Sequence, residues 1–375
     1  MNRTRLFVVA LLAACAAPVA PVAAQSSPET QPTAPARKAV VVPPGFKLIV
    51  DGHRNALCQE GDEAWVRQAL ADQTPTTRPT TMPVNLLERV TEQRDVLVER
   101  MTADMALPDP APARSMFDDD LIPLLRRAAD FHPPIFYLVA TRDALRQIVQ
   151  GGWTDPQNRY HFNRAAGQVS IDTRLTLSID GAGDDQVLAV LYEPTDDLIS
   201  RRERLLRELR GVEGQLAFEL SNRALLATQL QFVNFITRNA VEPMNLPREQ
   251  QWFGVGMIGV LSARYLATIS GAPVEVILGN MIAEDRRNPV RPSTVDLLNP
   301  MDLQQLREQA RPAYATAMQR KSTAVVKSWL DRAGPSALPR VITAMRANPP
   351  ADGPALVRLI AEQTGIDLTP ELRPR

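Results

Sequence analysis

The spacing of apolar residues divides the chain into a mixed front part and a helical rear part. Short apolar or alternating runs bounded by turn residues predict strands within 39–50, 133–140, 167–180 and 186–194. In the run 39–50, a Pro-Pro-Gly turn interrupts the strand. Apolar residues recur at a helical period over 84–105, and Thr141 is expected to cap a short helix that follows the strand 133–140.

After residue 197 the pattern is almost entirely helical. Helices are predicted at roughly 200–237, 244–270, 301–331, 335–347 and 353–365. Ser200 and Glu203 have the spacing of a capping box at the start of the first of these helices. The chain is therefore predicted to be an α+β protein, in which a small sheet ends by about residue 194 and a mostly helical half begins at about residue 200.

Three local patterns have structural interpretations that we favour over functional ones. The aspartates of FDDDL (117–121) are expected at a helix start, where they complement the helix dipole, in preference to a cation site. The glycines of GVGMIG (254–259) indicate close helix packing in preference to phosphate binding. Arginines 201, 202, 204, 207 and 210 alternate with glutamates, which is more typical of a solvated helix face than of a docking surface.

The first residues have the three parts of an export signal: a basic start, an apolar run and a stretch of small residues. Residues 1–24 are assigned to this signal and 25–38, which are polar and rich in proline, to a flexible tether. LAAC fits a lipobox ending at Cys15, whereas VAA fits cleavage before Gln25; we favour the lipobox. Either reading predicts an exported protein of the periplasm or cell envelope, and the lipobox reading predicts that lipid on Cys15 holds it to the membrane.

The composition of the chain limits which partners and cross-links can be expected. The 42 basic and 42 acidic side chains cancel, which gives no electrostatic reason to expect nucleic acid as a partner. The membrane is expected as a partner only through the lipid anchor, since no later apolar run looks long enough to cross it. Cys58 is the only cysteine outside the leader, so no internal disulfide is expected, and its predicted role is that of a small, partly buried residue.

One short motif carries the candidate chemistry. Residues 218–222 read FELSN, in which Glu219 holds the position of the glutamate in the zinc-peptidase motif H-E-x-x-H. In that motif two histidines one helical turn apart bind one zinc ion. Phe218 and Asn222 stand at the histidine positions, and neither a phenyl ring nor a carboxamide is a useful zinc ligand. The isolated histidines His53, His132 and His161 have no metal-binding spacing.

Two further stretches strengthen this comparison. LPREQQWFGVGMIGVLSARYLA (246–267) resembles the segment that carries the third zinc ligand in gluzincin-type (peptidase MA-like) zinc peptidases, with Pro247, Trp252 and Gly256 matching. Residues 313–368 resemble the C-terminal helices of the same group, so the resemblance covers roughly residues 130 to 368. The resemblance implies a degenerate, metallopeptidase-like domain at 131–375, and the apolar pattern before it predicts a region of strand and helix at 39–130.

Position by position, the resemblance places the two histidines on Phe218 and Asn222, the catalytic glutamate on Glu219 and the third ligand on Val255. Only Glu219 is retained, and zinc needs three or four protein donors. Glu242 and Glu249 are nearby carboxylates that lack histidine partners. The resemblance therefore implies that no metal is bound, no cofactor is needed and no catalytic set is intact.

These observations predict an exported, catalytically inactive relative of a zinc peptidase. It would act by binding an unidentified protein or peptide partner, or serve as a structural component of the envelope. Two alternatives stay open: a working hydrolase with an unrecognised site, and a structural lipoprotein unrelated to peptidases. Glu219 is expected to be a structural residue, because a glutamate without a metal has no bound water to activate.

Overall fold

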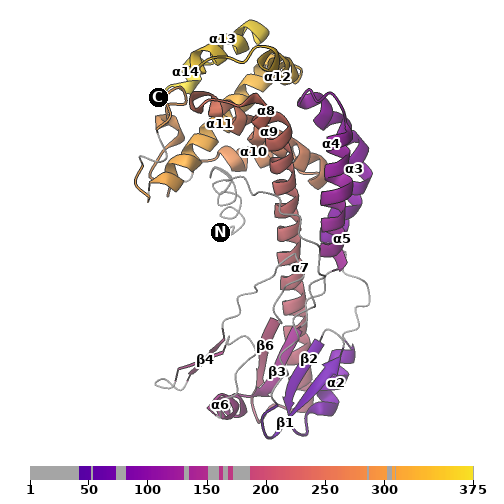
Figure 1. Ribbon diagram of the computed structural model, residues 1–375. Helices are drawn as coiled ribbons and strands as arrows, with labels where there is room; N and C mark the ends of the chain where they lie inside the picture. The colour runs from indigo at the N-terminus through magenta and orange to yellow at the C-terminus, as the bar shows by residue number, and fades with distance from the viewer. Residues whose placement is uncertain are drawn as a thin grey trace, which may run out of the picture. The chain divides into compact units, whose positions relative to one another are not determined.

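The computed structural model describes residues 42–51, 54–72, 82–130, 135–150, 160–163, 168–171, 186–284, 287–301, 306–308 and 310–374. These residues belong to two compact units, and each unit is discontinuous in sequence (Figure 1). The sheet unit takes the described residues of Gln25–Asn85 and Leu125–Ala224. The helical unit takes Leu86–Leu124 and the described residues of Leu225–Arg375.

The sheet unit contains six described strands, with helices before, between and after them. Its elements in chain order are β1 (Phe46–Asp51), β2 (Arg54–Gln59), α2 (Glu63–Asp72), the greater part of α5 (Ile122–Asp130), β3 (Ile135–Thr141), α6 (Arg142–Gln150), β4 (Tyr160–Asn163), β5 (Gln168–Ile171), β6 (Gln186–Tyr192) and the first part of α7 (Leu198–Ile236).

Four of these strands form one sheet in the order β1-β2-β3-β6. β1 is antiparallel to β2, whereas β2, β3 and β6 are parallel, with Leu57 opposite Leu138 and Leu138 opposite Ala189. β4 and β5 form a separate antiparallel pair. β3 and β6 are almost wholly apolar in sequence, as expected for parallel strands that are covered on both faces.

Each face of the four-stranded sheet has its own buried cluster, because successive side chains point to opposite faces. On one face, Cys58, Tyr137 and Val190 pack with residues of α2 and with Leu205 and Leu209 of α7. On the other face, Leu57 and Leu138 pack with Leu145 and Ile148 of α6. The sheet unit is therefore a three-layer α/β arrangement.

Local hydrogen bonds explain where α6 and α7 begin. The Thr141 hydroxyl accepts a hydrogen bond from the backbone N–H of Ala144 at 3.2 Å, so the predicted cap of α6 is confirmed. For α7 the predicted capping box is wrong. Asp197 is the capping residue: its carboxylate accepts from the Ser200 backbone N–H at 2.8 Å, and this hydrogen bond lowers the pKa of Asp197.

The helical unit consists of helices and short turns throughout its described residues. They are most of α3 (Met82–Asp104), α4 (Ala111–Ser115), the π-helical turn η1 (Met116–Leu121), the end of α7, the π-helical turn η2 (Thr237–Val241), α8 (Glu242–Met244), the 3₁₀ turn η3 (Arg248–Gln250), α9 (Gln251–Ser270), α10 (Val274–Ile282), the 3₁₀ turn η4 (Pro292–Thr294), α11 (Arg311–Ala333), α12 (Ala337–Ala347), α13 (Gly353–Thr364) and α14 (Thr369–Leu372).

Glycines let α9 and α11 approach each other closely. A Cβ atom on Gly259 would lie 2.4 Å from the Thr323 hydroxyl oxygen, and one on Gly256 would meet α11 as tightly. Further along the two helices, the rings of Phe253 and Trp329 lie 5.9 Å apart. The prediction that GVGMIG serves close helix packing is thus confirmed.

A buried lysine of α11 forms hydrogen bonds with the backbone of the C-terminal segment. Lys321 is 7% exposed, and its ammonium donates hydrogen bonds to the backbone oxygens of Val295 (2.6 Å), Leu372 (3.2 Å) and Arg373 (2.6 Å). Carbonyl groups at the end of α14 are thereby paired with a charged donor, which is the stronger kind of hydrogen bond.

The α+β fold predicted from the sequence is confirmed, and several of its elements differ in detail. Elements absent from the prediction include β2, α2, β4 and α10. The helix predicted at 244–270 is interrupted, because Asn245 adopts a left-handed conformation (φ 44°) after α8 and α9 begins at Gln251. The helix predicted at 301–331 begins at Arg311. The aspartates of FDDDL do not start a helix: they lie in η1, directly after α4.

One stretch, Arg248–Ser270, is long and apolar enough by composition to cross a membrane, contrary to the sequence-based expectation. Its most apolar window is 67% buried within the protein, which is also what a core helix of a folded domain looks like. Residues 1–41, with the predicted export signal, Cys15 and the tether, lie outside the described residues.

Candidate functional site

The four positions of the degenerate zinc motif lie on two helices. Phe218, Glu219 and Asn222 belong to the uninterrupted α7, so positions 218 and 222 are one turn apart, as the motif requires. The side chains of Phe218 and Glu219 are outside the described part of the structure; that of Asn222 is half-buried. Val255 is half-buried on α9. Because Val255 and the other three positions fall in different units, their convergence stays a prediction.

The described residues contain no group of three or more histidine, cysteine, aspartate or glutamate side chains that could hold a metal ion. His53 and His132 fall outside them, and His161 is in β4 with an undescribed side chain. Cys58 is a buried free thiol, and burial raises its pKa to about 12, so it is protonated at neutral pH. This agrees with the structural role predicted for Cys58.

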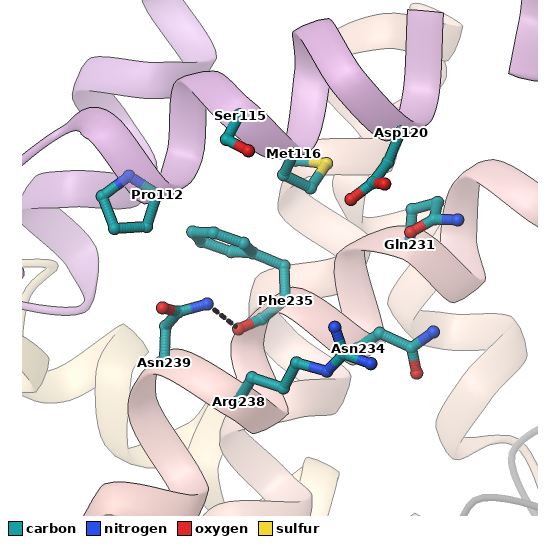
Figure 2. Close-up of a pocket in the computed structure, with 9 residues that line it drawn as sticks. All are labelled: Pro112, Ser115, Met116, Asp120, Gln231, Asn234, Phe235, Arg238 and Asn239. Carbon is teal, nitrogen blue, oxygen red and sulfur yellow. Dashed lines mark hydrogen bonds between the residues drawn. The ribbon is translucent and has the colours of Figure 1, made fainter. Parts of the chain in front are cut away.

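A pocket of about 220 Å³ lies in the helical unit, between α4–η1 on one side and α7–η2 on the other (Figure 2). It is lined by Pro112, Ser115, Met116, Asp120, Gln231, Asn234, Phe235, Arg238 and Asn239. On each side the lining positions recur at intervals of three and four residues, which places them on one face of a helical segment. The pocket is therefore built on helices and not on loops.

Four polar side chains line this pocket and have no partner within the described part of the chain. Asp120 and Arg238 carry opposite charges and are exposed, while Gln231 and Asn234 are half-buried carboxamides. None of these four side chains has a hydrogen bond or ion pair with the residues that the structure describes. They are therefore free to bind water or a ligand.

The remaining lining residues are held in place by internal contacts. The Asn239 amide donates to the Phe235 backbone oxygen at 3.0 Å (Figure 2), and the Ser115 hydroxyl donates to Asp119 at 2.7 Å. Phe235 and Met116 are buried, at 5% and 4% exposure. Figure 2 shows the Phe235 ring pointing from α7 towards Pro112 and Met116, which gives the pocket an apolar side.

Contacts behind the pocket fix its two walls. The ring of Phe232 on α7 lies 6.2 Å from Phe117 of η1 and 5.7 Å from Tyr265 of α9, both edge-on. On the other side, Arg346 of α12 donates to the backbone oxygens of Ala106 (2.7 Å) and Asn239 (3.2 Å). The pocket therefore has rigid support on both walls.

Both walls contain a π-helical turn. Met116 and Asp120 come from η1, and Arg238 and Asn239 come from η2. Such turns are rare in helices and are found frequently at functional sites. Two of them lining one pocket is a second, independent reason to consider the pocket functional.

A polar cluster also occupies the carboxyl ends of the parallel strands in the sheet unit. Tyr192 ends β6, and its hydroxyl donates to the Asp62 carboxylate; the Trp65 indole N–H donates to the same carboxylate at 2.8 Å. The Arg201 guanidinium lies 3.6 Å from Asp62 and 4.6 Å from the centre of the Tyr192 ring. Burial, with the Asp62 contact, raises the pKa of Tyr192 well above its usual value.

The ends of the three parallel strands are linked through one side chain. The Gln59 amide oxygen, at the end of β2, accepts from the Thr141 backbone N–H at 3.0 Å and lies 3.0 Å from the Tyr192 hydroxyl oxygen. Ligands often bind at this edge of a parallel sheet. Here the polar groups satisfy one another, so the cluster acts as a structural connection between the sheet, α2 and α7.

The arginines at the start of α7 divide between two roles. Arg201 and Arg204 donate to backbone oxygens, and Arg202 forms an ion pair with Asp72. Arg207 and Arg210 are exposed. The predicted solvated face is therefore correct for the last two arginines, and the first three are occupied within the sheet unit.

Sequence reasoning did not find the pocket. Its only sequence signal is a run of polar residues at helical spacing, at 231, 234, 238 and 239, interrupted by the apolar Phe235. A run of this kind looks the same as a solvated helix face. A scan against protein-family models, a search of curated proteins and a search of solved structures each found no match to this chain.

Proposed function

We propose that this chain is an exported, catalytically inactive relative of gluzincin-type zinc peptidases, and that it acts by binding. The observation that carries the proposal is the chemistry at one helical turn of α7. The spacing of positions 218 and 222 suits two zinc ligands, yet the residues are Phe218 and Asn222. With Val255 at the third ligand position, three metal donors are replaced together, while Glu219 alone is retained.

Two of the four polar side chains in the pocket of the helical unit, Gln231 and Asn234, suit binding and not proton transfer. A carboxamide such as Gln231 or Asn234 does not take up or release a proton near neutral pH, so it cannot serve as a general acid or base. It can, however, both donate and accept hydrogen bonds. These residues supply recognition without a reactive group.

Metal analysis tests the proposal directly. Purified mature protein, dialysed against zinc and then against metal-free buffer, is expected to hold far less than one zinc per chain and to leave unstructured peptides uncut. Stoichiometric zinc together with peptide cleavage would overturn the proposal in favour of a working hydrolase.

A second experiment tests the alignment of the motif. The triple variant Phe218→His/Asn222→His/Val255→Glu is expected to gain zinc affinity, since it restores two histidines one turn apart and a third ligand. The matched control is the triple variant Phe218→His/Arg223→His/Val255→Glu, in which the two histidines are not one helical turn apart. If a folded triple variant binds zinc no better than this control, the proposed relation to zinc peptidases fails.

Export and lipidation are proposed from the leader alone. Mass spectrometry of the processed protein distinguishes an acylated N-terminal Cys15 from a free N-terminal Gln25. Cys15→Ser is expected to abolish acylation and release the protein from the membrane fraction. An unprocessed N-terminus that stays in the cytoplasm would contradict export.

A further inference from the structure

We propose that the pocket between α4–η1 and α7–η2 binds a small zwitterion of the amino-acid class. The ligand's ammonium group would face Asp120 and its carboxylate Arg238, and its side chain would lie towards the apolar side of the pocket. The inference goes beyond the proposed function, because it depends neither on export nor on the relation to zinc peptidases.

The two charges give the main argument. Asp120 and Arg238 line the same pocket, carry opposite charges and have no ion-pair partner among the described residues, including each other. Guanidinium binds a carboxylate through two parallel hydrogen bonds, and a carboxylate accepts hydrogen bonds from an ammonium group. A ligand that carries both groups can therefore pair with both charged side chains of the pocket. Because such a ligand has no net charge, its binding does not change the net charge of the protein.

The carboxamides supply the polar contacts between the charges. Gln231 and Asn234 line the same pocket as Asp120 and Arg238 (Figure 2). Each carboxamide has a hydrogen-bond donor and an acceptor. Each can therefore form a hydrogen bond with either the ammonium group or the carboxylate of the ligand. A purely apolar ligand would leave these groups without partners, which is costly on desolvation.

The apolar side of the pocket suits the remainder of an amino acid. Pro112, Met116 and Phe235 line this side, so a ligand side chain can contact carbon atoms there. The volume of about 220 Å³ is below the range of roughly 300–1,000 Å³ that is typical of pockets for drug-sized ligands. This size favours a single amino acid over an extended peptide.

Isothermal titration calorimetry of the mature protein tests the proposal. The probes are the common L-amino acids, one at a time, at concentrations up to millimolar. At least one is expected to bind. Asp120→Asn or Arg238→Gln is expected to raise the Kd of that amino acid about tenfold or more, and a tenfold change corresponds to about 1.4 kcal/mol. Glu99→Gln and Arg358→Gln remove exposed charges of the same unit outside the pocket and are expected to change nothing.

Modified ligands test the same contacts, first through their weaker binding to the original chain and then in combination with the two substitutions. The N-acetyl derivative of the bound amino acid lacks the ammonium group, so its binding is expected to be weak and insensitive to Asp120→Asn. The amide derivative lacks the carboxylate and is expected to be insensitive to Arg238→Gln. These two arms keep the test informative if a pocket variant does not fold.

Three outcomes would overturn the proposal. The first is that the folded protein binds none of the amino acids at millimolar concentration. The second is that binding is unchanged by both pocket substitutions. The third is that a neutral sugar binds more tightly than any amino acid. None of these outcomes bears on zinc binding by the triple variant, so the two proposals fail separately.

Discussion

The backbone oxygen of Ser322 would lie only 2.4 Å from a Cβ atom placed on Gly256. The same Cβ would lie 2.5 Å from a methyl group of Val326. Both distances are well inside van der Waals contact, and the first involves a backbone atom of a helix that cannot rotate away. The pairing of α9 with α11 therefore depends on the absence of a side chain at position 256.

Gly256→Ala is accordingly expected to destabilise the protein by about 1 to 3 kcal/mol, the usual range for overpacking a well-packed core. Gly279→Ala is the matched control, because a Cβ there meets no atom within 4 Å and alanine favours a helix by up to about 1 kcal/mol over glycine. Urea unfolding of the two variants should move the midpoint in opposite directions. Equal stability of both variants would contradict the observed packing.

Lys321→Met is expected to destabilise the helical unit by about 2 to 3 kcal/mol or more, since it leaves buried carbonyl groups without their charged donor. Lys327→Met on the same helix removes only an exposed pair with Asp331 and should cost at most about 0.5 kcal/mol. Hydrogen exchange should show faster opening of residues 369–372 in the first variant alone. Unchanged protection there would show that Lys321 does not hold the C-terminal segment.

Two aspartates of the helical unit should respond to neutralisation with opposite signs. Burial raises the pKa of Asp104, which accepts a hydrogen bond from the Tyr265 hydroxyl at 3.3 Å. A raised pKa means that the folded state disfavours the carboxylate, so stability falls as pH rises through the folded-state pKa. Asp104→Asn is therefore expected to stabilise the protein at neutral pH. This increase in the free energy of unfolding should become smaller at acidic pH.

The hydrogen bond from Arg94 lowers the pKa of the partly exposed Asp118, so this carboxylate contributes stability that is lost as pH falls. Asp118→Asn should destabilise by up to about 1 kcal/mol at neutral pH, as expected for an exposed ion pair. Thermal unfolding at neutral and acidic pH measures both variants. The same sign for Asp104→Asn and Asp118→Asn would contradict these assignments.

Cys58 should make the protein sensitive to alkali. Its pKa is raised to about 12 by burial, from the reference value of 9.0, so above pH 9 the unfolded chain loses this proton while the folded protein keeps it. Stability is therefore expected to fall as pH rises between about 9 and 12. Urea unfolding between pH 8 and 10 should show a flatter pH dependence for Cys58→Ala than for the original chain; identical slopes would contradict burial as the cause.

Much of the fold follows from local sequence, because the buried runs of β3 and β6 and the periodic helices carry their own signals. β2 was missed for a local reason. Its sequence begins with Arg54, which looks like a turn residue after Gly52 and His53, yet Arg54 is only 6% exposed and donates to the Leu70 backbone oxygen at 3.3 Å. A strand that buries an arginine does not have the usual hydrophobic pattern.

The pocket could not be predicted in the same way. Asp120 and Arg238 are more than 100 residues apart in sequence, and nothing in the pattern of either segment indicates that they line one cavity. The π-helical turns have no sequence signature either, since they depend on how the two helical segments pack. For the zinc-motif positions the situation is reversed. The motif predicts which residues should lie close together in space, but whether they do so depends on the whole fold.

Each place where the described chain passes from one unit to the other falls within a helix: α3, α5 and α7. No stretch of loop joins the units at these points, and neither unit is a continuous stretch of sequence. Expression of either one alone would require cutting helices and rejoining distant segments. Truncation of the chain at any single residue therefore cannot yield one whole unit without part of the other.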